Sequence, residues 1–321
     1  MQPGVIPRKV GIVGYPRYTA LDETLTRVVD FATERGLSLS FEPDLLPSGG
    51  GWGTLDSDSV SDLDLLLTLG GDGTLLRGAR LVAPLGIPVL GVNLGRLGFL
   101  TSLSPEDLEA GLTRLMTGET VLDDRMVLQV EAETRSGKVD GGYLALNDVV
   151  LHRGGVARMI RMRIHTHGEE VGTYSADGII LATPTGSTAY SLSAGGPIVP
   201  PNLDCILATP ICPHTLAVRP LILSADDTIT VEVLSPTEEL ILTIDGQEGA
   251  NLMPGDRLVV RRAPLPLHVV RFPGQTFFST LRRKLAWGDL GEREKADGKG
   301  EENQSASPHL PTAGPRPSSP A

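Results

Sequence analysis

The stretch Leu63-Asp-Leu-Leu-Leu-Thr-Leu-Gly-Gly-Asp-Gly-Thr74 sets the fold class of this chain. Residues 63–69 form a nearly continuous apolar run, as expected for a parallel strand that is buried on both faces. Glycines then end the strand, and Leu75 to Val82 has the apolar spacing of a helix. A buried strand, a glycine turn and a helix in this order predict one unit of an α/β fold.

The same alternation of strand and helix extends on both sides of this stretch. Lys9 to Val13 and Ile87 to Val92 are further strand candidates, and Leu21 to Ala32 carries the apolar face of a helix. The sequence Ser-Pro-Glu-Asp at 104–107 is predicted to open another helix, with a capping serine and a proline at the first helical position. This order predicts a Rossmann-like parallel sheet with helices on both faces.

The pattern changes near Asp123. From Met126 to Val270 the chain offers short β-branched runs between Gly, Pro, Asn or Asp turns, which predicts a predominantly β second domain. The C-terminal stretch is rich first in Glu, Lys and Gly and then in Ser and Pro, so it is predicted to be disordered. The predicted division is an α/β domain over 1–125, a β-rich domain over 126–268 and a tail over 289–321.

Composition excludes several classes of protein. The 321 residues contain 28 Lys and Arg against 39 Asp and Glu, a net charge of −11, which argues against constitutive binding of nucleic acid or anionic membranes. No apolar run approaches the ~18 residues of a membrane span, and the start of the chain lacks the core of a signal peptide. Cys205 and Cys212 match neither a disulfide framework nor a zinc site. A cytoplasmic protein is expected.

The glycine turn at 70–74 contains the residue with the sharpest chemistry. Its glycines let backbone N–H groups approach an anion closely, and the N-terminus of the following helix adds positive potential, so the turn can cradle a phosphate. Asp72 would repel that phosphate unless Mg²⁺ offsets its charge, and its presence makes sense if it accepts a proton from an attacking hydroxyl. The alternative is a glycine turn whose aspartate only caps the helix. No P-loop Lys-Ser/Thr follows, and no Gly-x-Ser-x-Gly elbow occurs, which disfavours P-loop NTPases and serine hydrolases.

A loop rich in hydroxyls and glycine, residues 183–197, is the second candidate. Near it, Asp177 could bind a cationic or amide-bearing group, and Tyr190 could stack on a planar one. The same composition is also typical of a turn cluster between two strands, in which Ser and Thr bond the local backbone.

Asn147 and Asp148 interrupt the apolar run Leu144 to Leu151. Polar residues within such a strand are either hydrogen-bond anchors of the core or ligand contacts, and this pair could chelate a ribose diol. Four arginines follow closely and form either a solvated strand face or a phosphate clamp. They are Arg153, Arg158, Arg161 and Arg163.

Together these features resemble NAD kinases of the bacterial type that uses ATP or polyphosphate. The resemblance covers roughly Lys9 to Trp287. The motifs that carry it are Gly-Ile-Val-Gly at 11–14, Gly-Gly-Asp-Gly-Thr at 70–74, Asn93 with Leu-Gly-Phe-Leu at 97–100, Leu-Asn-Asp-Val-Val-Leu-His at 146–152, Asp177-Gly, Ala-Thr-Pro-Thr-Gly-Ser-Thr-Ala-Tyr at 182–190, Pro-His-Thr-Leu at 213–216, Arg219-Pro and Asp-Gly-Gln at 245–247.

The resemblance implies transfer of the γ-phosphoryl group of ATP, or of a phosphoryl group of polyphosphate, to the 2′-hydroxyl of the adenosine ribose of NAD. Asp72 would be the base, and Gly73 would support the phosphates. A divalent cation such as Mg²⁺ would be held mainly through the substrate phosphates, with no metal ligand expected from the protein. The remaining implied substrate contacts are Arg77, Phe99, Asn147, Asp148, Arg158, Asp177, Thr185, Thr188, Ala189, Tyr190, Ser193 and Gln247. The resemblance also implies that residues 269–288 return to the first domain and that the protein is a homodimer or homotetramer.

One position departs from the family pattern. The ribose-holding pair is usually Asn-Glu, and Asp148 shortens the carboxylate by one methylene, which we expect the protein to tolerate. Two other functions remain open. A lipid or sugar kinase would keep Asp72 but lack a dinucleotide loop such as 183–193, and a non-catalytic NAD(P)-binding sensor would not need Asp72.

Overall fold

The computed structural model describes residues 2–47, 51–96, 98–137, 139–154, 159–215, 217–234 and 240–286. The chain divides into two compact units, residues 1–277 and 278–321, and every contact discussed below lies inside the first. Helix α6, Phe277–Leu285, belongs almost entirely to the second unit. The predicted disordered tail, 289–321, lies outside the described residues.

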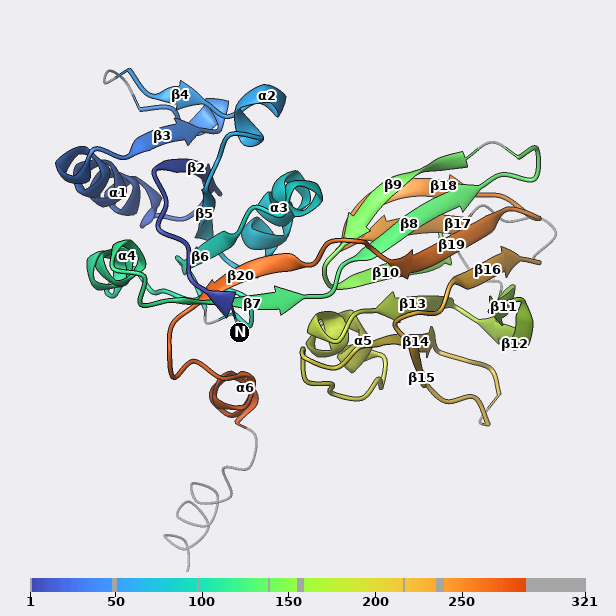
Figure 1. Cartoon of the computed structure of the whole chain (residues 1–321). Helices are drawn as coiled ribbons and strands as arrows, with labels where there is room; N and C mark the ends of the chain where they lie inside the picture. Colours follow the sequence, from blue (N-terminus) through green and yellow to red (C-terminus); the bar gives the residue numbers. More distant parts are fainter. Residues whose placement is uncertain are drawn as a thin grey trace, which may run out of the picture. The chain divides into compact units, whose positions relative to one another are not determined.

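An eight-stranded sheet organises the α/β part of the first unit (Figure 1). Its strands are β1 (Gln2–Pro3), β2 (Lys9–Gly14), β3 (Ser38–Phe41), β4 (Gly53–Thr54), β5 (Leu65–Gly70), β6 (Val89–Asn93), β7 (Val121–Arg125) and β20 (Leu267–Arg271). They lie in the order β1-β7-β20-β6-β5-β2-β3-β4. Neighbouring strands pair in parallel throughout the part of this sheet that runs β6-β5-β2-β3-β4. This confirms the predicted α/β fold with a parallel sheet.

Strand β5 is buried on both faces, as its sequence predicts. Leu65, Leu67 and Leu69 belong to one hydrophobic cluster, while Leu66 belongs to another. Side chains alternate across a strand, so the two clusters lie on opposite faces of the sheet. Helices and short 3₁₀ turns connect the strands: α1 (Leu21–Arg35), η1 (Pro43–Leu45), α2 (Ser57–Val60), α3 (Asp72–Val82), η2 (Ala83–Leu85) and α4 (Leu108–Met116).

The predicted start of helix α4 is wrong by three residues. The helix begins at Leu108, and the backbone N–H of Asp107 instead bonds the carbonyl of Ser104, which closes a turn. The Ser104 hydroxyl donates to the Asp107 carboxylate at 2.9 Å. The capping serine therefore stabilises a turn before the helix rather than its first turn, because its side chain is bonded to the neighbouring acid.

Two six-stranded antiparallel sheets build the β-rich part, as the sequence predicts. One has the order β15 (Leu221–Ser224), β14 (Cys205–Ile211), β13 (Gly178–Ala182), β10 (Asp148–Arg153), β17 (Leu240–Ile244), β18 (Gln247–Leu252). The other has the order β12 (Glu169–Ala176), β11 (Ile160–Thr166), β16 (Ile229–Val233), β19 (Arg257–Arg262), β8 (Leu128–Glu133), β9 (Val139–Ala145). The turn η3 (Thr185–Thr188) and the short helix α5 (Tyr190–Ser193) follow β13.

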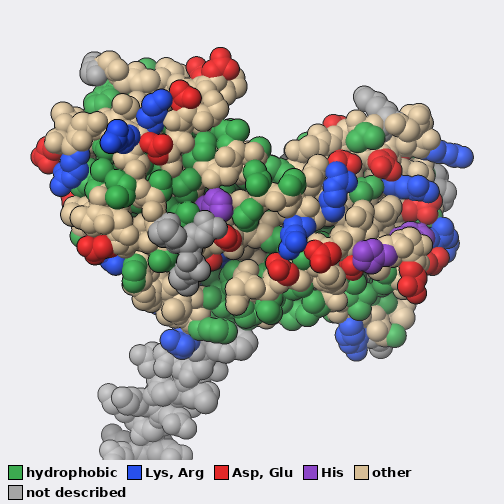
Figure 2. Space-filling view, viewed as in Figure 1, with side chains coloured by type: hydrophobic (Ala, Val, Ile, Leu, Met, Phe, Trp, Pro, Cys, Tyr) green, Lys and Arg blue, Asp and Glu red, His purple; other side chains and the backbone are tan. Residues whose placement is uncertain are grey.

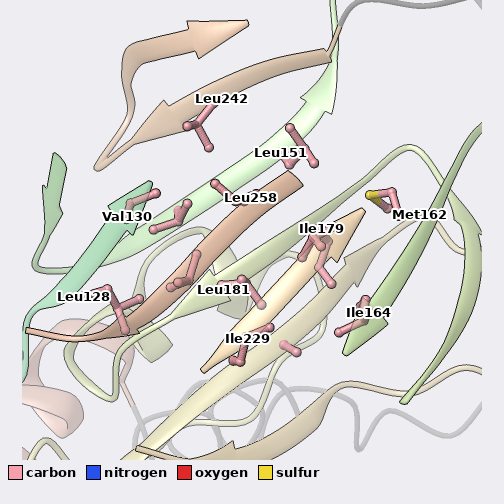
Figure 3. Close-up of a cluster of buried hydrophobic side chains, with 14 of the residues drawn as sticks. Leu128, Val130, Leu151, Met162, Ile164, Ile179, Leu181, Ile229, Leu242 and Leu258 are labelled. Atoms are coloured by element: carbon pink, nitrogen blue, oxygen red, sulfur yellow. The ribbon is translucent and has the colours of Figure 1, made fainter. Parts of the chain in front are cut away.

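The two antiparallel sheets share one hydrophobic core. Leu151, Ile179 and Leu242 come from one sheet, and Leu128 and Ile164 come from the other (Figure 3). In β8, buried residues alternate with partly exposed ones, the period expected when one face of a sheet packs on another. This core fixes β10, and with it the position of Asp148 at the start of that strand.

Strand β20 follows the β-rich part in sequence yet lies inside the first sheet, between β6 and β7 (Figure 1). It pairs in parallel with β6 through Val269 and antiparallel with β7. Its apolar side chains join both clusters of the α/β part, because Val270 packs in one and Val269 in the other. This insertion brings Arg271 beside the chain that follows β6.

Charges of both signs are interspersed over the face seen in Figure 2. The net charge of −11 therefore does not appear there as one continuous acidic surface. Among the described helices, none combines the length and the apolar character that a membrane crossing requires.

Candidate functional site

Asp72 is the first residue of α3 and follows directly from the buried strand β5. Its carboxylate faces the turn that comes after β6. Oδ2 accepts the backbone N–H of Phe99 at 2.8 Å, and Oδ1 accepts those of Leu100 at 3.1 Å and Thr101 at 3.4 Å. These bonds run to a neighbouring segment, so the side chain joins two segments of the sheet edge instead of only capping its own helix.

Gly98 allows the close approach of Asp72 to this turn. A Cβ at position 98 would lie 1.9 Å from Oδ1 and 2.6 Å from Cγ of Asp72. Any larger side chain there would displace the carboxylate or the turn. Gly73 differs, because a Cβ at that position would meet no atom within 4 Å, which leaves its backbone open to approach by a ligand.

Arg77 lies one turn further along α3 than Gly73. In this structure its guanidinium pairs with Glu42 and donates to the carbonyl of Gly14 at 2.7 Å. Glu42 in turn accepts the backbone N–H of Gly14 at 3.1 Å. Arg77, predicted as a phosphate contact, thus ties α3 to the end of β2.

A cavity of about 620 Å³ brings together five of the predicted site residues. They are Asn147, Asp148, Asp177, Ala189 and Tyr190. The other lining residues are Val150, His152, Arg153, Ile211, Thr243, Asp245 and Gly246. Its wall combines apolar side chains with carboxylates, a guanidinium and a half-exposed aromatic ring, the mixed lining that is typical of small-molecule sites.

Asp245 also lines the cavity, although it is not among the predicted substrate contacts and appears in the sequence only within the motif at 245–247. Its buried carboxylate accepts three successive backbone N–H groups, from Leu146 at 3.0 Å, Asn147 at 2.7 Å and Asp148 at 3.0 Å. It lies with Gly246 in the turn between β17 and β18, both with positive φ. The Asp-Gly pair predicts that hairpin turn, but nothing local indicates that the side chain bonds another strand.

The Asp148 carboxyl is buried beside that of Asp245. Burial, and after it the neighbouring Asp245 carboxylate, raise the pKa of Asp148 to about 7, against the opposing effect of the backbone N–H of Tyr190. Burial also raises the pKa of Asp245, against the three N–H groups and Arg80. Asp148 therefore changes charge near neutral pH and can accept a hydrogen bond from a sugar hydroxyl once it is ionised.

This shift predicts how stability depends on pH. Because the pKa of Asp148 is higher in the folded chain than in the unfolded one, the folded chain keeps a proton between about pH 4 and pH 7 that the unfolded chain has lost. The free energy of unfolding should therefore fall across that range as pH rises. Asp148→Asn should abolish this loss of stability with rising pH. The variant should therefore be more stable than wild type at pH 8, by roughly 2 to 4 kcal/mol.

Urea unfolding of both proteins from pH 4 to pH 8 measures this difference. We expect the two curves of stability against pH to diverge as pH rises. Curves that stay parallel over the range would show that Asp148 is not a buried titrating group.

Two predicted residues of the hydroxyl-rich loop, Thr185 and Thr188, are not among the residues that line the cavity. Thr185 is buried, and its hydroxyl accepts from the guanidinium of Arg125 at 3.3 Å. The hydroxyl of Thr188 donates to the carbonyl of Thr185 at 3.3 Å. On the wall itself, Asp177 pairs with Arg153 at 3.6 Å.

The remaining predicted residues lie outside the cavity lining. Ser193 is exposed at the end of α5. Gln247 is exposed, and its side-chain oxygen accepts from the guanidinium of Arg80 on α3, the helix that begins at Asp72. Arg158 lies outside the described residues. No cluster of three or more His, Cys, Asp or Glu side chains that could bind a metal occurs in the part of the chain that the structure describes.

Comparison with known proteins relates this geometry to one family. Residues 54–120 match the model of the ATP-NAD kinase N-terminal domain, and residues 146–272 match that of the ATP-NAD kinase C-terminal domain. An NAD kinase of Gemmatimonas aurantiaca is 50% identical over 89% of this chain and 98% of its own length. An NAD kinase of Heliobacterium modesticaldum is 48% identical over 72% of this chain and 81% of its own length.

Two solved structures share the architecture. A yeast NADH kinase in complex with NADH superposes with a TM-score of 0.81 at 28% identity, covering 89% of this chain and 88% of its own. An NAD kinase from Archaeoglobus fulgidus in complex with ATP gives a TM-score of 0.68 at 26% identity, covering 87% of this chain and 98% of its own.

Proposed function

This chain belongs to the NAD kinase family, and we propose from that membership that it transfers a phosphoryl group from ATP or polyphosphate to the 2′-hydroxyl of the adenosine ribose of NAD, giving NADP. The observation that carries the proposal is the Asp72 carboxylate, fixed by three backbone N–H groups at the glycine-rich end of a buried parallel strand. Relatives that align over nearly their full length support it.

We propose that Asp72 acts as the general base. A base must lie at hydrogen-bond distance from the hydroxyl it deprotonates and hold one orientation. The three N–H groups supply that orientation, since they act on both carboxylate oxygens. Gly73, with no atom near its missing Cβ, leaves space for a phosphate at the N-terminus of α3.

We propose that the 620 Å³ cavity takes part of the dinucleotide. Ribose hydroxyls would donate to the Asp148 carboxylate, and Tyr190 would lie against a planar ring. The NADH bound to the yeast neighbour supports a dinucleotide site in this fold. The further contacts proposed are Arg77, Phe99, Asn147, Arg158, Asp177, Thr185, Thr188, Ala189, Ser193 and Gln247.

The proposal extends to the cation and the assembly. Mg²⁺ or another divalent cation would be held mainly by the substrate phosphates and would neutralise part of their charge. We further propose a cytoplasmic homodimer or homotetramer. Its chain would be divided into domains over 1–125 and 126–268, a segment over 269–288 that returns to the first domain, and a tail over 289–321.

An assay of NADP formation from NAD tests the proposal, with ATP or polyphosphate as donor and Mg²⁺ present. We expect NADP with at least one donor, and we expect chelation of the cation by EDTA to reduce the rate to background. The binding of NAD without turnover under either donor would favour a sensor. Phosphorylation of a sugar or lipid but not of NAD would favour the other kinase classes.

A further inference from the structure

The turn at residues 99–101 is fixed by hydrogen bonds to two side chains, Asp72 and Arg271. Asp72 accepts the N–H groups of residues 99–101, while the Arg271 guanidinium donates to the carbonyls of the same turn. Nη2 of Arg271 lies 2.7 Å from the carbonyl oxygen of Phe99, and Nη1 lies 3.2 Å from that of Thr101. The turn therefore lies between a carboxylate and a guanidinium, each bonded to its backbone.

Arg271 is buried beside a second arginine. Its Nε lies 3.6 Å from the carboxylate of Asp123, which also accepts Nε of Arg125 at 3.0 Å and Nη2 of Arg125 at 2.5 Å. Burial, and after it the neighbouring Arg125, lower the pKa of Arg271 to about 10, against the opposing effects of Asp123 and Asp72. Burying two guanidinium groups beside one carboxylate is costly, so these groups need the fixed hydrogen bonds they make.

The same network extends to the hydroxyl-rich loop. Nη1 of Arg125 donates to the hydroxyl of Thr185 at 3.3 Å, and both residues are buried. The hydroxyl of Thr188 is bonded to Thr185 in turn. One chain of contacts thus runs from the turn at residues 99–101 through the buried Arg271, the partly exposed Asp123 and the buried Arg125 to the segment that carries Tyr190.

We propose that Arg271 is a positioning residue that holds the turn at residues 99–101, and through it Asp72, in the orientation for proton transfer. In the same proposal, Asp123 and Arg125 couple this turn to the loop at Thr185. The proposal rests on the kinase function proposed above. It requires the planar fork of an arginine, because one guanidinium must reach two carbonyls and a carboxylate at once, which a single ammonium group does not reproduce.

Arg271→Lys tests the role, because it keeps the charge and loses the fork. When the base is displaced by a fraction of an ångström, the rate of reaction falls more than the affinity for substrate does. We therefore expect kcat to fall at least about 10-fold. The KM for NAD should stay within about threefold, since Arg271 lies outside the lining of the cavity. Arg261→Lys is the matched control, because that arginine also pairs with an acid, Glu131, but far from the turn in sequence and sheet. Its kcat should be unchanged.

A double-mutant cycle separates positioning from general destabilisation. If Arg271 acts through Asp72, Arg271→Lys should cause no further loss of kcat in an Asp72→Asn background. Equal losses in both backgrounds would overturn the proposal. Wild-type protein that makes no NADP would instead contradict the proposed function, so the two failures are distinguishable.

The other end of the network has its own readout. Arg125→Lys should loosen Thr185 and raise the KM for NAD about 10-fold, the usual effect of losing a hydrogen bond to a charged group.

If the Arg271→Lys variant does not fold, Asp123→Asn takes its place as the test. This substitution keeps the size of the side chain and weakens the contacts of both arginines. It should lower kcat and raise KM together, and a folded Asp123→Asn variant with wild-type values of both would refute the coupling.

Discussion

Asp72→Asn is expected to lower kcat by at least about 100-fold, the usual contribution of a general base, while the affinity for NAD stays largely unchanged. The amide cannot accept the proton of the attacking hydroxyl. Its oxygen can still accept the two N–H groups that now bond Oδ1, so most of the turn should remain in place. NADP formation at saturating substrates measures kcat, and equilibrium titration with NAD measures binding.

Asp107→Asn is the control for this substitution. Asp107 immediately precedes helix α4 and is exposed, so the same change of charge is made at a second helix start without altering the turn at residues 99–101. Its kcat should match that of wild type. Turnover of Asp72→Asn within a few-fold of wild type would show that Asp72 is not the base.

Gly98→Ala should have an effect of similar size without altering any ionisable group. The added Cβ would lie 1.9 Å from Oδ1 of Asp72, so either the carboxylate or the turn must move. Overpacking of this kind costs about 1 to 3 kcal/mol of stability, and a displacement near 1 Å costs about 100-fold in rate. We expect both losses, the first in urea unfolding and the second in kcat.

The Gly98→Ala substitution made in an Asp72→Ala background shows whether the alanine clashes with the side chain of Asp72. Asp72→Ala removes the atoms that the new Cβ would meet. Gly98→Ala should then cost little further stability in that background. A full loss of stability there would mean that the alanine acts on the backbone of the turn rather than on the carboxylate.

Much of the α/β part is predictable because its signals are local. The run of leucines at 65–69 is apolar on both faces, and the glycines after it end the strand, so β5 and α3 form where expected. The family was predicted from motifs along the chain and is confirmed by the matches over 54–120 and 146–272. The start of α4 was mispredicted, because a side-chain bond between Ser104 and Asp107 competes with the cap.

The site was predictable in its residue types but not in its connections. Asn147, Asp148 and Asp177 attract notice because they are polar residues in or beside apolar strands, and the structure brings them to one cavity. In the sequence, Asp245 belongs to the Asp-Gly-Gln motif at 245–247 and to a hairpin turn, and neither feature indicates which residues its side chain bonds. Its three bonds to residues 146–148 depend on the pairing of β17 with β10, strands that lie about 90 residues apart in sequence.

The sequence by itself determined the order of strands and helices and the glycine turn with its aspartate, because each depends on residues close together along the chain. It also determined the family, because each of the separate motifs that carry the resemblance is short and legible by itself. Only the tertiary structure decided what holds that aspartate. The insertion of β20 between β6 and β7 places Arg271 against the carbonyls of a turn about 170 residues earlier in the chain. Pairing between strands so far apart in sequence depends on the burial of side chains on both faces of the sheet. No short stretch of sequence indicates which strands will pair in this way.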